Sequence, residues 1–242
     1  MDCIYGAEQM DAAKLLIPVK RYVNLAGKFY WPAHKNPSAV HIGYNSRIEG
    51  REAYQMMILP DKIEITAAGD AGAYYAIQTL TDLIALENGN LHCCKIEDWP
   101  DFARRGVYLD CSRGKVPKLE TLKELVSRLA HWKINELQLY IENVFTFSRH
   151  PAIGRGYSPF TVDEILTLQD YCKLHHVRLV GSLASFGHLE KILMLPEYQH
   201  LGELPGFRGF PGGATLCPTD PGSIKLIREL YEEFVPLFEA VD

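Results

Sequence analysis

The 242-residue sequence has no long hydrophobic run and no cluster of basic residues. No apolar stretch approaches the roughly 20 residues that a helix needs to span a bilayer, so a membrane protein is not expected. The N-terminus also lacks the basic start and apolar core of a signal peptide. The basic residues are scattered and the formal net charge is −5, which argues against a nucleic-acid-binding protein.

Cysteines are few, and their spacing suits neither a metal site nor a disulfide framework. Six are present, the only close pair is Cys93-Cys94, and no C-x-x-C spacing occurs. We therefore expect free, mostly buried thiols in a reducing compartment. Together with the missing signal peptide, this favours a cytoplasmic location. A thiol nucleophile at Cys111 is the alternative, although no helper base lies near it in the sequence.

The composition is that of a globular protein, with 47% hydrophobic and 23% charged residues. A chain of this length fits one large domain or two small ones. The residue pattern changes near residue 98, and Pro100 breaks regular structure there. We predict one domain over residues 1–98 and a second over residues 99–242.

The first domain is predicted to be a small α+β layer. Its predicted strands cover residues 17–22, 40–44, 52–59 and 62–67. The last two flank Pro60-Asp61 and therefore predict a hairpin. Turn signals involve residues 31–32 and 36–38. A loop is expected at residues 69–72, and hydrophobic spacing predicts a helix over residues 73–86.

The second domain alternates between strand and helix patterns. Predicted strands cover residues 105–109, 135–143 and 177–183, and predicted helices begin near residues 119, 161 and 221. Thr161 and Glu164 form a capping box, and Asp220-Pro221 is a helix start. Three strands that are each followed by a loop and a helix fit the first part of a (β/α)₈ barrel. The predicted fold class is α/β, with a small α+β N-terminal domain followed by a partial TIM barrel.

In such barrels the chemistry lies in the loops at the C-terminal strand ends. Polar residues follow each predicted strand there: Asp110 and Arg113, then Glu142 and Asn143, then Ser185 and His188. These side chains could converge on one cleft. The pair His175-His176 is a poor metal site because neighbouring helix residues do not share a face. The Gly/Pro-rich residues 205–217 lack the Lys-Ser/Thr of a phosphate loop, and no metal or organic cofactor is implied.

Four segments resemble, in order, the first part of the barrel of family-20 glycoside hydrolases, the β-N-acetylhexosaminidases. They are R-G-V-Y-L-D-C-S-R (105–113), W-K-I-N-E-L-Q-L-Y-I-E-N (132–143), A-S-F-G-H-L-E (184–190) and L-C-P-T-D-P-G (216–222). Residues 52–84 resemble the small domain that precedes this barrel. The resemblance covers nearly the whole chain. It implies a hydrolase that removes terminal β-linked N-acetylhexosamine from a glycan.

The resemblance also implies roles for single residues. Arg113 matches an arginine that binds sugar hydroxyls, a task that suits the fixed planar donors of a guanidinium. We assign Arg113 and Asp110 to substrate binding; a purely structural ion pair between them is the alternative. His188 matches the histidine that supports the catalytic acid, with an ordinary loop histidine as the alternative. Asn143 stands where the family has an aspartate, and Glu142 is expected to replace part of the lost charge.

The family's adjacent Asp-Glu pair has no counterpart in the sequence. In these enzymes the acetamido oxygen of the substrate attacks the anomeric carbon, the aspartate orients it, and the glutamate protonates the leaving oxygen. Here Asp163-Glu164 opens a predicted helix and Glu232-Glu233 lies within one, so neither pair sits at a strand end. A full barrel takes about 250 residues. The pair is therefore expected beyond Asp242, and the 242-residue chain is expected to be inactive.

Two other classes of function stay open. One is a non-catalytic glycan-binding protein that has a barrel-type sugar pocket. The other is a chain that self-associates through an open barrel edge, because unpaired strand edges favour association. Phe234 and Phe238 of the last helix are expected to have less sheet to pack on, so we expect the chain either to self-associate through this edge or to hold its last helix loosely.

Overall fold

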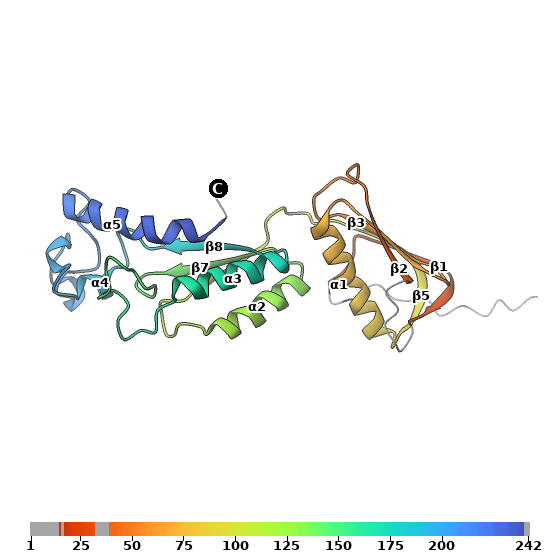
Figure 1. The fold of residues 1–242 in the computed structure, drawn as a ribbon, viewed down its shortest axis with the longest axis horizontal. Coiled ribbons are helices and arrows are strands. Elements are labelled where there is room, and N and C mark those ends of the chain that lie inside the picture. The colour runs from red at the N-terminus through yellow and green to blue at the C-terminus, as the bar shows by residue number, and fades with distance from the viewer. Residues whose placement is uncertain (1–14, 16, 32–38, 240–242) are drawn as a thin grey trace, which may run out of the picture. The chain divides into compact units, whose positions relative to one another are not determined.

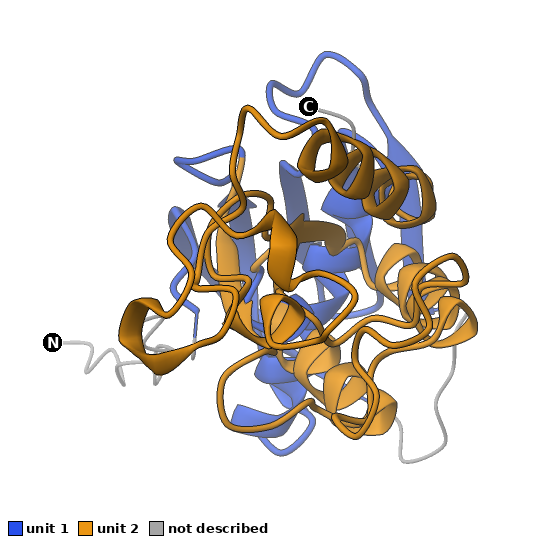
Figure 2. Ribbon diagram, turned by 90° about the vertical axis from the view of Figure 1, so that its left-hand side faces the viewer, with its two compact units in different colours: residues 1–103, 130–133 blue, residues 104–129, 134–242 orange. Residues whose placement is uncertain are grey.

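The computed structural model describes Leu15, residues 17–31 and residues 39–239. The chain divides into two compact units, residues 1–103 with 130–133 and residues 104–129 with 134–242 (Figure 2). Cys3 and the turn signals that involve residues 32 and 36–38 lie outside the described residues. Within the described part, no helix has the length and hydrophobicity needed to cross a membrane.

Unit 1 is built on a five-stranded sheet and helix α1 (Figure 1). Its elements are β1 (Arg21–Tyr30), β2 (Val40–Tyr44), β3 (Tyr54–Ile58), β4 (Ile63–Ala67), α1 (Asp70–Leu86) and β5 (Asn90–Asp98). The strand order is β1-β5-β3-β4-β2, with β2 parallel to β4 and the other neighbours antiparallel.

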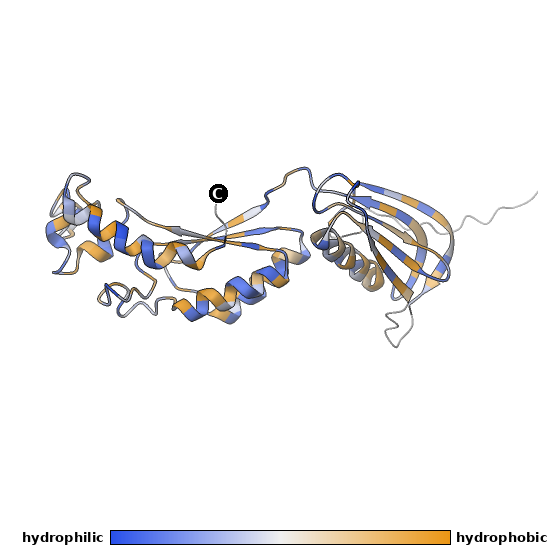
Figure 3. Cartoon of the chain, turned by 45° about the horizontal axis from the view of Figure 1, so that its top comes forward, coloured by the Kyte–Doolittle hydropathy of each residue, from blue (hydrophilic) through white to orange (hydrophobic). Residues whose placement is uncertain are grey.

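The core of unit 1 forms where alternate strand residues meet one side of α1. It includes Met56, Ile58, Ile63 and Ile65 from β3 and β4, and Ala76, Leu80 and Leu83 from α1. Hydrophobic and hydrophilic residues alternate along these strands (Figure 3). The amide of Leu59 donates to the carbonyl of Lys62 at 2.9 Å, which closes the turn between β3 and β4. The predicted hairpin is therefore confirmed.

Three predictions for unit 1 need correction. Strand β1 begins at Arg21 and runs to Tyr30, well beyond the predicted residues 17–22. Strand β5 was not predicted, although it pairs with both β1 and β3. Helix α1 starts at Asp70, inside the predicted loop at residues 69–72. Gly72 lies within the helix, where its missing side chain lets α1 approach the backbone at Ala53. A Cβ at position 72 would lie only 2.5 Å from the carbonyl oxygen of Ala53.

Unit 2 contains a three-stranded parallel sheet in the order β6-β7-β8. Its main elements are β6 (Gly106–Asp110), α2 (Leu119–His131, of which the last two residues are counted in unit 1), β7 (Glu136–Ile141), α3 (Val162–Leu174), β8 (Arg178–Leu183) and α5 (Pro221–Phe234). Short helices α4 (Glu190–Leu193), η3 (Gln199–Leu201), η4 (Phe207–Gly209) and η5 (Val235–Leu237) complete it. Strand and helix thus alternate as predicted.

The two faces of this sheet differ in burial. Leu137, Leu139, Ile141 and Leu179 point to one face and are all 0% exposed. Helices α3 and α5 both pack against β8. The opposite face carries polar and aromatic side chains, namely Tyr108, Gln138, Tyr140 and Ser182. Tyr108 is 57% exposed, and its hydroxyl lies 3.0 Å from that of Ser182.

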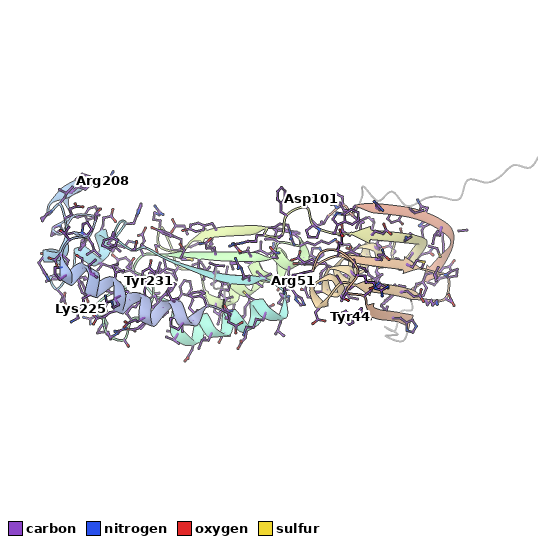
Figure 4. All side chains as sticks on the ribbon, turned by 90° about the horizontal axis from the view of Figure 1, so that it is seen from above. Tyr44, Arg51, Asp101, Arg208, Lys225 and Tyr231 are labelled. Carbon is purple, nitrogen blue, oxygen red and sulfur yellow. The ribbon has the colours of Figure 1, made fainter. Side chains whose placement is uncertain are left out.

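The predicted helix starts in unit 2 are confirmed: α2 begins at Leu119, and the two predicted caps are both formed. Thr161 and Glu164 form the capping box of α3, and the Asp220 side chain accepts the amide of Gly222 at the start of α5. Tyr231 on α5, labelled in Figure 4, donates its hydroxyl to the Leu183 carbonyl at 2.9 Å.

The expectation that the last aromatics lack a surface to pack on is wrong. Phe234 is 2% exposed and Phe238 is 8% exposed. Both rings lie over Gly181 of β8, where an added Cβ would come within 2.7 Å of each. The ring of Phe234 also packs against Phe145, with 5.3 Å between centroids. A glycine in β8 and a residue from the loop after β7 therefore supply the missing surface.

Candidate functional site

The candidate residues lie at or just beyond the C-terminal ends of the three parallel strands. Asp110 is the last residue of β6, and Glu142 and Asn143 follow β7 directly. In the sheet register Asp110 is paired with Tyr140, and Tyr140 is paired with Ser182. The parallel register therefore brings these chain segments to one edge of the sheet.

Asp110 and Arg113 form an ion pair in the loop after β6. The Arg113 Nε donates to Asp110 Oδ2 at 2.5 Å. The amides of Ser112 and Arg113 donate to Asp110 Oδ1 at 2.9 and 3.1 Å. Burial raises the pKa of Asp110, but these hydrogen bonds outweigh it and hold the pKa below its ordinary value. The Arg113 side chain is still 59% exposed, so the ion pair leaves its guanidinium open to a ligand.

Tyr140 joins Arg113 to His188. The Arg113 guanidinium carbon lies 5.3 Å from the centroid of the Tyr140 ring. The His188 imidazole meets the same ring edge-on, with 6.4 Å between centroids. Burial raises the pKa of Tyr140 to about 12, and the nearby Glu142 carboxylate adds to the shift, so Tyr140 is a neutral donor at pH 7. Two predicted site residues thus contact one side chain that was not predicted.

Glu142 and Asn143 are buried behind this group. Glu142 is 5% exposed; its Oε1 lies 3.9 Å from Arg113 Nη2, and its amide donates to Ser112 Oγ at 2.7 Å. Asn143 is 2% exposed, and neither its Oδ1 nor its Nδ2 has a hydrogen-bond partner among the described residues. A buried amide without partners is costly, commonly by about 1–3 kcal/mol. The described residues therefore leave the hydrogen-bonding capacity of the Asn143 amide unused.

The other sequence candidates are less suited to chemistry. Cys111 is 0% exposed, and burial raises the pKa of its thiol to about 12. Since the thiolate is the nucleophile, this environment disfavours the alternative of a thiol enzyme. Ser185 lies two residues beyond β8 and is partly exposed. Among the described residues, no group of three or more His, Cys, Asp or Glu side chains could hold a metal ion.

Tyr140 was missed because it alternates with buried leucines in a strand and was interpreted as part of the sheet pattern. The signal that could have identified Tyr140 is its position at the C-terminal end of the strand. It is the second-last residue of β7, two before Glu142, so both side chains leave the strand on the same side.

Comparison with known proteins gives a consistent result. Residues 11–99 match the family model described as glycosyl hydrolase family 20, domain 2. Beta-hexosaminidase subunit A1 of Dictyostelium discoideum is 25% identical over 200 residues, which cover 77% of this chain and 37% of that protein. N,N'-diacetylchitobiase of Vibrio harveyi is 36% identical over 90 residues, which cover 37% of this chain and 10% of that protein.

A solved structure shares the fold. The family-20 exo β-N-acetylglucosaminidase of Vibrio harveyi, in complex with N-acetylglucosamine, superposes with a TM-score of 0.79 at 20% identity. The match covers 97% of this chain and 46% of that chain. The mixed α/β fold is thus that of family-20 structures, and the chain spans less than half the length of each of these three proteins.

Proposed function

We propose that this family-20 β-N-acetylhexosaminidase-like chain belongs to a glycosidase that removes terminal β-linked N-acetylhexosamine. Within that protein, residues 1–98 are the hexosaminidase-type N-terminal domain and residues 99–242 are the first part of the catalytic TIM barrel. The parallel order β6-β7-β8, with a helix after each strand, supports this assignment.

The observation that carries the proposal is the exposed Arg113 guanidinium at the strand ends. Asp110 fixes its Nε side, and the Tyr140 ring lies beside it. The remaining N–H donors are fixed in one plane and match the vicinal hydroxyls of a pyranose. Arg113 therefore binds the sugar hydroxyls. Asp110 orients the Arg113 guanidinium and can accept a hydrogen bond from a sugar hydroxyl in the same contact.

His188, Asn143 and Glu142 act in support. In substrate-assisted retaining catalysis the acetamido oxygen of the sugar attacks the anomeric carbon, while a carboxylic acid protonates the leaving oxygen. No adjacent Asp-Glu pair follows a strand in this sequence, so none of these residues is that acid. The unpartnered amide of Asn143 and the imidazole of His188 are suited to bond and orient it. Glu142 supplies the negative charge that Asn143 lacks.

The test separates sugar binding from turnover. We expect no hydrolysis of an aryl N-acetylglucosaminide by the 242-residue chain, because acid catalysis alone contributes about 10²–10⁴-fold. We expect N-acetylglucosamine to shift NMR signals of residues at the strand ends, and Arg113→Ala to abolish the shifts.

Arg208→Ala is the matched control. Arg208 also lies 5.3 Å from an aromatic ring, that of Phe207, and is labelled in Figure 4. This variant should bind the sugar as the parent chain does. Turnover that co-purifies with the chain and disappears in Arg113→Ala would contradict the expected inactivity. Equal binding by both variants would contradict the role of Arg113.

The second candidate is a non-catalytic glycan-binding protein. The exposed Arg113 guanidinium beside the Tyr140 ring supports it, because these two side chains can bind sugar without an acid. Sugar binding without turnover by the longest natural form of the protein would decide for this candidate.

We also propose self-association through the edge of β8, which among the described strands pairs with β7 alone. Light scattering at several concentrations tests that.

A further inference from the structure

Lys191 connects three loops at the strand ends. It lies on α4, three residues after His188. Its ammonium donates to the carbonyl oxygen of Ser112 at 2.5 Å and lies 5.2 Å from the centroid of the Tyr157 ring. A hydrogen bond from a charged donor is about twice as strong as a neutral one. The segment after β8 thereby holds the loops that follow β6 and β7.

Ser112 occupies the centre of the Arg113 loop. Its amide donates to Asp110 Oδ1 at 2.9 Å, and its hydroxyl accepts the Glu142 amide at 2.7 Å. The residue is 4% exposed. Its carbonyl belongs to the peptide unit whose amide is that of Arg113, and this amide also donates to Asp110 Oδ1. A rotation of this peptide plane would move both groups at once.

The Ser112 carbonyl therefore controls the direction of the Arg113 backbone. With Lys191 in place, the carbonyl points to the ammonium while the amide on its other side points to Asp110. Without Lys191, the carbonyl would turn toward water, and the Arg113 amide would leave its bond with Asp110. Because Asp110 also accepts from Arg113 Nε, the guanidinium would lose its fixed direction.

We propose that Lys191 is a positioning residue that fixes the Arg113 guanidinium through the Ser112–Arg113 peptide. Its effect on sugar affinity rests on the proposed function, whereas its effect on Arg113 does not. Among the described residues, Lys191 contacts the Ser112 carbonyl and the Tyr157 ring, so the proposed effect on the guanidinium passes through the Ser112–Arg113 peptide.

The direct readout is the Nε–H signal of Arg113 in a ¹⁵N spectrum of the 242-residue chain, assigned with Arg113→Lys. In the parent chain this proton is bonded to Asp110, so we expect it to exchange more slowly than that of a free arginine. Lys191→Met should speed its exchange about tenfold, the factor expected when a charge-assisted bond of this kind is lost. Lys191→Arg, which restores a cation, should recover slow exchange. Lys191→Gln, which keeps a neutral donor, should fall between the two and serves if the methionine variant does not fold.

The matched control is Lys123→Met. Lys123 also makes a hydrogen bond from its ammonium, to Glu120 Oε1 at 3.2 Å, and lies 5.9 Å from the centroid of the Tyr171 ring. It removes the same kinds of contact without touching Ser112, so it should leave Arg113 exchange unchanged. If Lys191→Met and Lys191→Gln also leave it unchanged, the proposal is overturned.

A titration with N-acetylglucosamine separates the two claims. If the parent chain binds the sugar, Lys191→Met should weaken binding about tenfold and Lys191→Arg should recover it. If the parent chain does not bind the sugar, the proposed function fails, while the exchange of Arg113 still decides the positioning role. Binding that is unchanged in a variant with fast Arg113 exchange would show that the guanidinium direction does not matter to the sugar.

Discussion

The sheets of the two units bring different parts of the chain together. In unit 1 most neighbouring strands are antiparallel, so successive strand ends alternate between opposite edges of the sheet. In unit 2 all three strands are parallel, so all their C-terminal ends share one edge. Unit 1 buries a core under α1, but the loops that follow its strands are divided between the two edges of the sheet. Unit 2 gathers the loops that carry Arg113, Glu142 and His188.

The two sheets also differ in whether their second face is expected to be covered or exposed to water. Antiparallel sheets commonly leave one face in water, whereas parallel sheets are usually covered on both. In unit 2 the face opposite the buried leucines holds Tyr108 and the ion pairs of Glu136 with Arg104 and Arg178, at 3.0 and 2.8 Å. Burial raises the pKa of Glu136, but the two arginines outweigh it and hold the pKa below its ordinary value. This face of the sheet is therefore polar, whereas the face with the buried leucines is apolar.

The largest effect should come from Phe234→Ala. The ring is buried against Gly181, Phe145 and Phe238, so its removal leaves a cavity in unit 2 and should lower the free energy of unfolding by about 3–5 kcal/mol. Urea unfolding followed by circular dichroism measures the change. Phe207→Ala, at a ring 46% exposed, is the control and should cost less than about 1 kcal/mol. Equal effects would mean that α5 is loosely held after all.

Asn143→Asp, which introduces the residue of the family pattern, should cost up to about 3 kcal/mol near pH 7. The carboxylate would be buried without a partner, so its folded pKa would lie above its unfolded value of about 3.9. A raised acid pKa leaves stability intact below the unfolded value. Stability is then lost as the pH rises, by about 1.4 kcal/mol per unit.

Unfolding midpoints of this variant and of the parent chain at pH 4.5 and 7 test the sign. The control is Asn45→Asp in unit 1, where the side chain lies in an exposed turn and accepts the amide of Arg47. Asn45→Asp should leave the unfolding midpoint nearly unchanged at both pH values. A variant with aspartate at 143 that is as stable as the parent at pH 7 would mean that a partner or water reaches this position.

The contrast between the units explains which features could be predicted from sequence. The hairpin at Pro60-Asp61 and the helix starts at Thr161 and Asp220 depend on side chains within a few residues of each other, so local chemistry specifies them. Strand β5 has no such signal. Its buried residues include the adjacent Cys93 and Cys94, which breaks simple alternation, and its partners lie far away in the chain.

The same reasoning applies to the site. Parallel strand ends share an edge, so Asp110, Arg113 and His188 could be placed near one another before any coordinates. The contacts of Tyr140 and Lys191 could not, because each depends on where a loop from another strand passes. Lys191 meets a carbonyl 79 positions earlier in the chain. Such contacts are set by tertiary packing and leave no periodic signal in the sequence.

A smaller effect concerns Glu233, which holds the loop after β7 against α5. It accepts the amides of Ser148 and Arg149 at 2.6 and 3.0 Å and the Nε of Arg149 at 3.1 Å. Burial raises the pKa of Glu233, but these bonds outweigh it and lower the pKa below 4.5. A lowered acid pKa means that the stabilisation is full above the unfolded value and is lost as the pH falls through the folded one.

Glu233→Gln should therefore cost about 1–2 kcal/mol at pH 6 and progressively less below pH 4.5, where the parent chain loses the same bonds. Urea midpoints of both chains at pH 6 and 3.5 measure the difference. Glu232→Gln is the control, since Glu232 makes one exposed ion pair with Arg149. A gap between parent and Glu233→Gln that stays constant with pH would exclude the carboxylate charge as its cause.

Thr161→Ala should destabilise unit 2 by about 1 kcal/mol, because it removes the oxygen that accepts the Glu164 amide at the start of α3. Thr161→Ser, which keeps the hydroxyl, is the control and should restore most of the stability. Thermal unfolding resolves a change of this size, since 1 kcal/mol shifts the midpoint by roughly 2–4 °C in a chain of 150–250 residues. Equal melting of the alanine variant and the parent would mean that water replaces the cap.

The smallest effect sharpens the contrast between the helices of the two units. Helix α1 has Gly69 at its N-cap, with no side-chain cap, whereas α3 has a full capping box. The φ of Gly69 is −173°, extended backbone that any residue adopts, and an added Cβ would lie 3.6 Å from its nearest neighbour, the Arg51 carbonyl oxygen. Gly69→Ser should therefore stabilise unit 1 by a few tenths of a kcal/mol, roughly the difference between serine and glycine caps.

Gly72→Ser provides the opposite control for the same helix. Its Cβ would lie 2.5 Å from the Ala53 carbonyl oxygen, so this serine should destabilise unit 1 by about 1–3 kcal/mol. Hydrogen exchange of the first α1 amides reads both variants directly, with slower exchange expected for Gly69→Ser and faster exchange for Gly72→Ser. If serine at position 69 speeds exchange, its hydroxyl does not cap α1 and the added side chain perturbs the first turn of the helix, so the prediction is wrong.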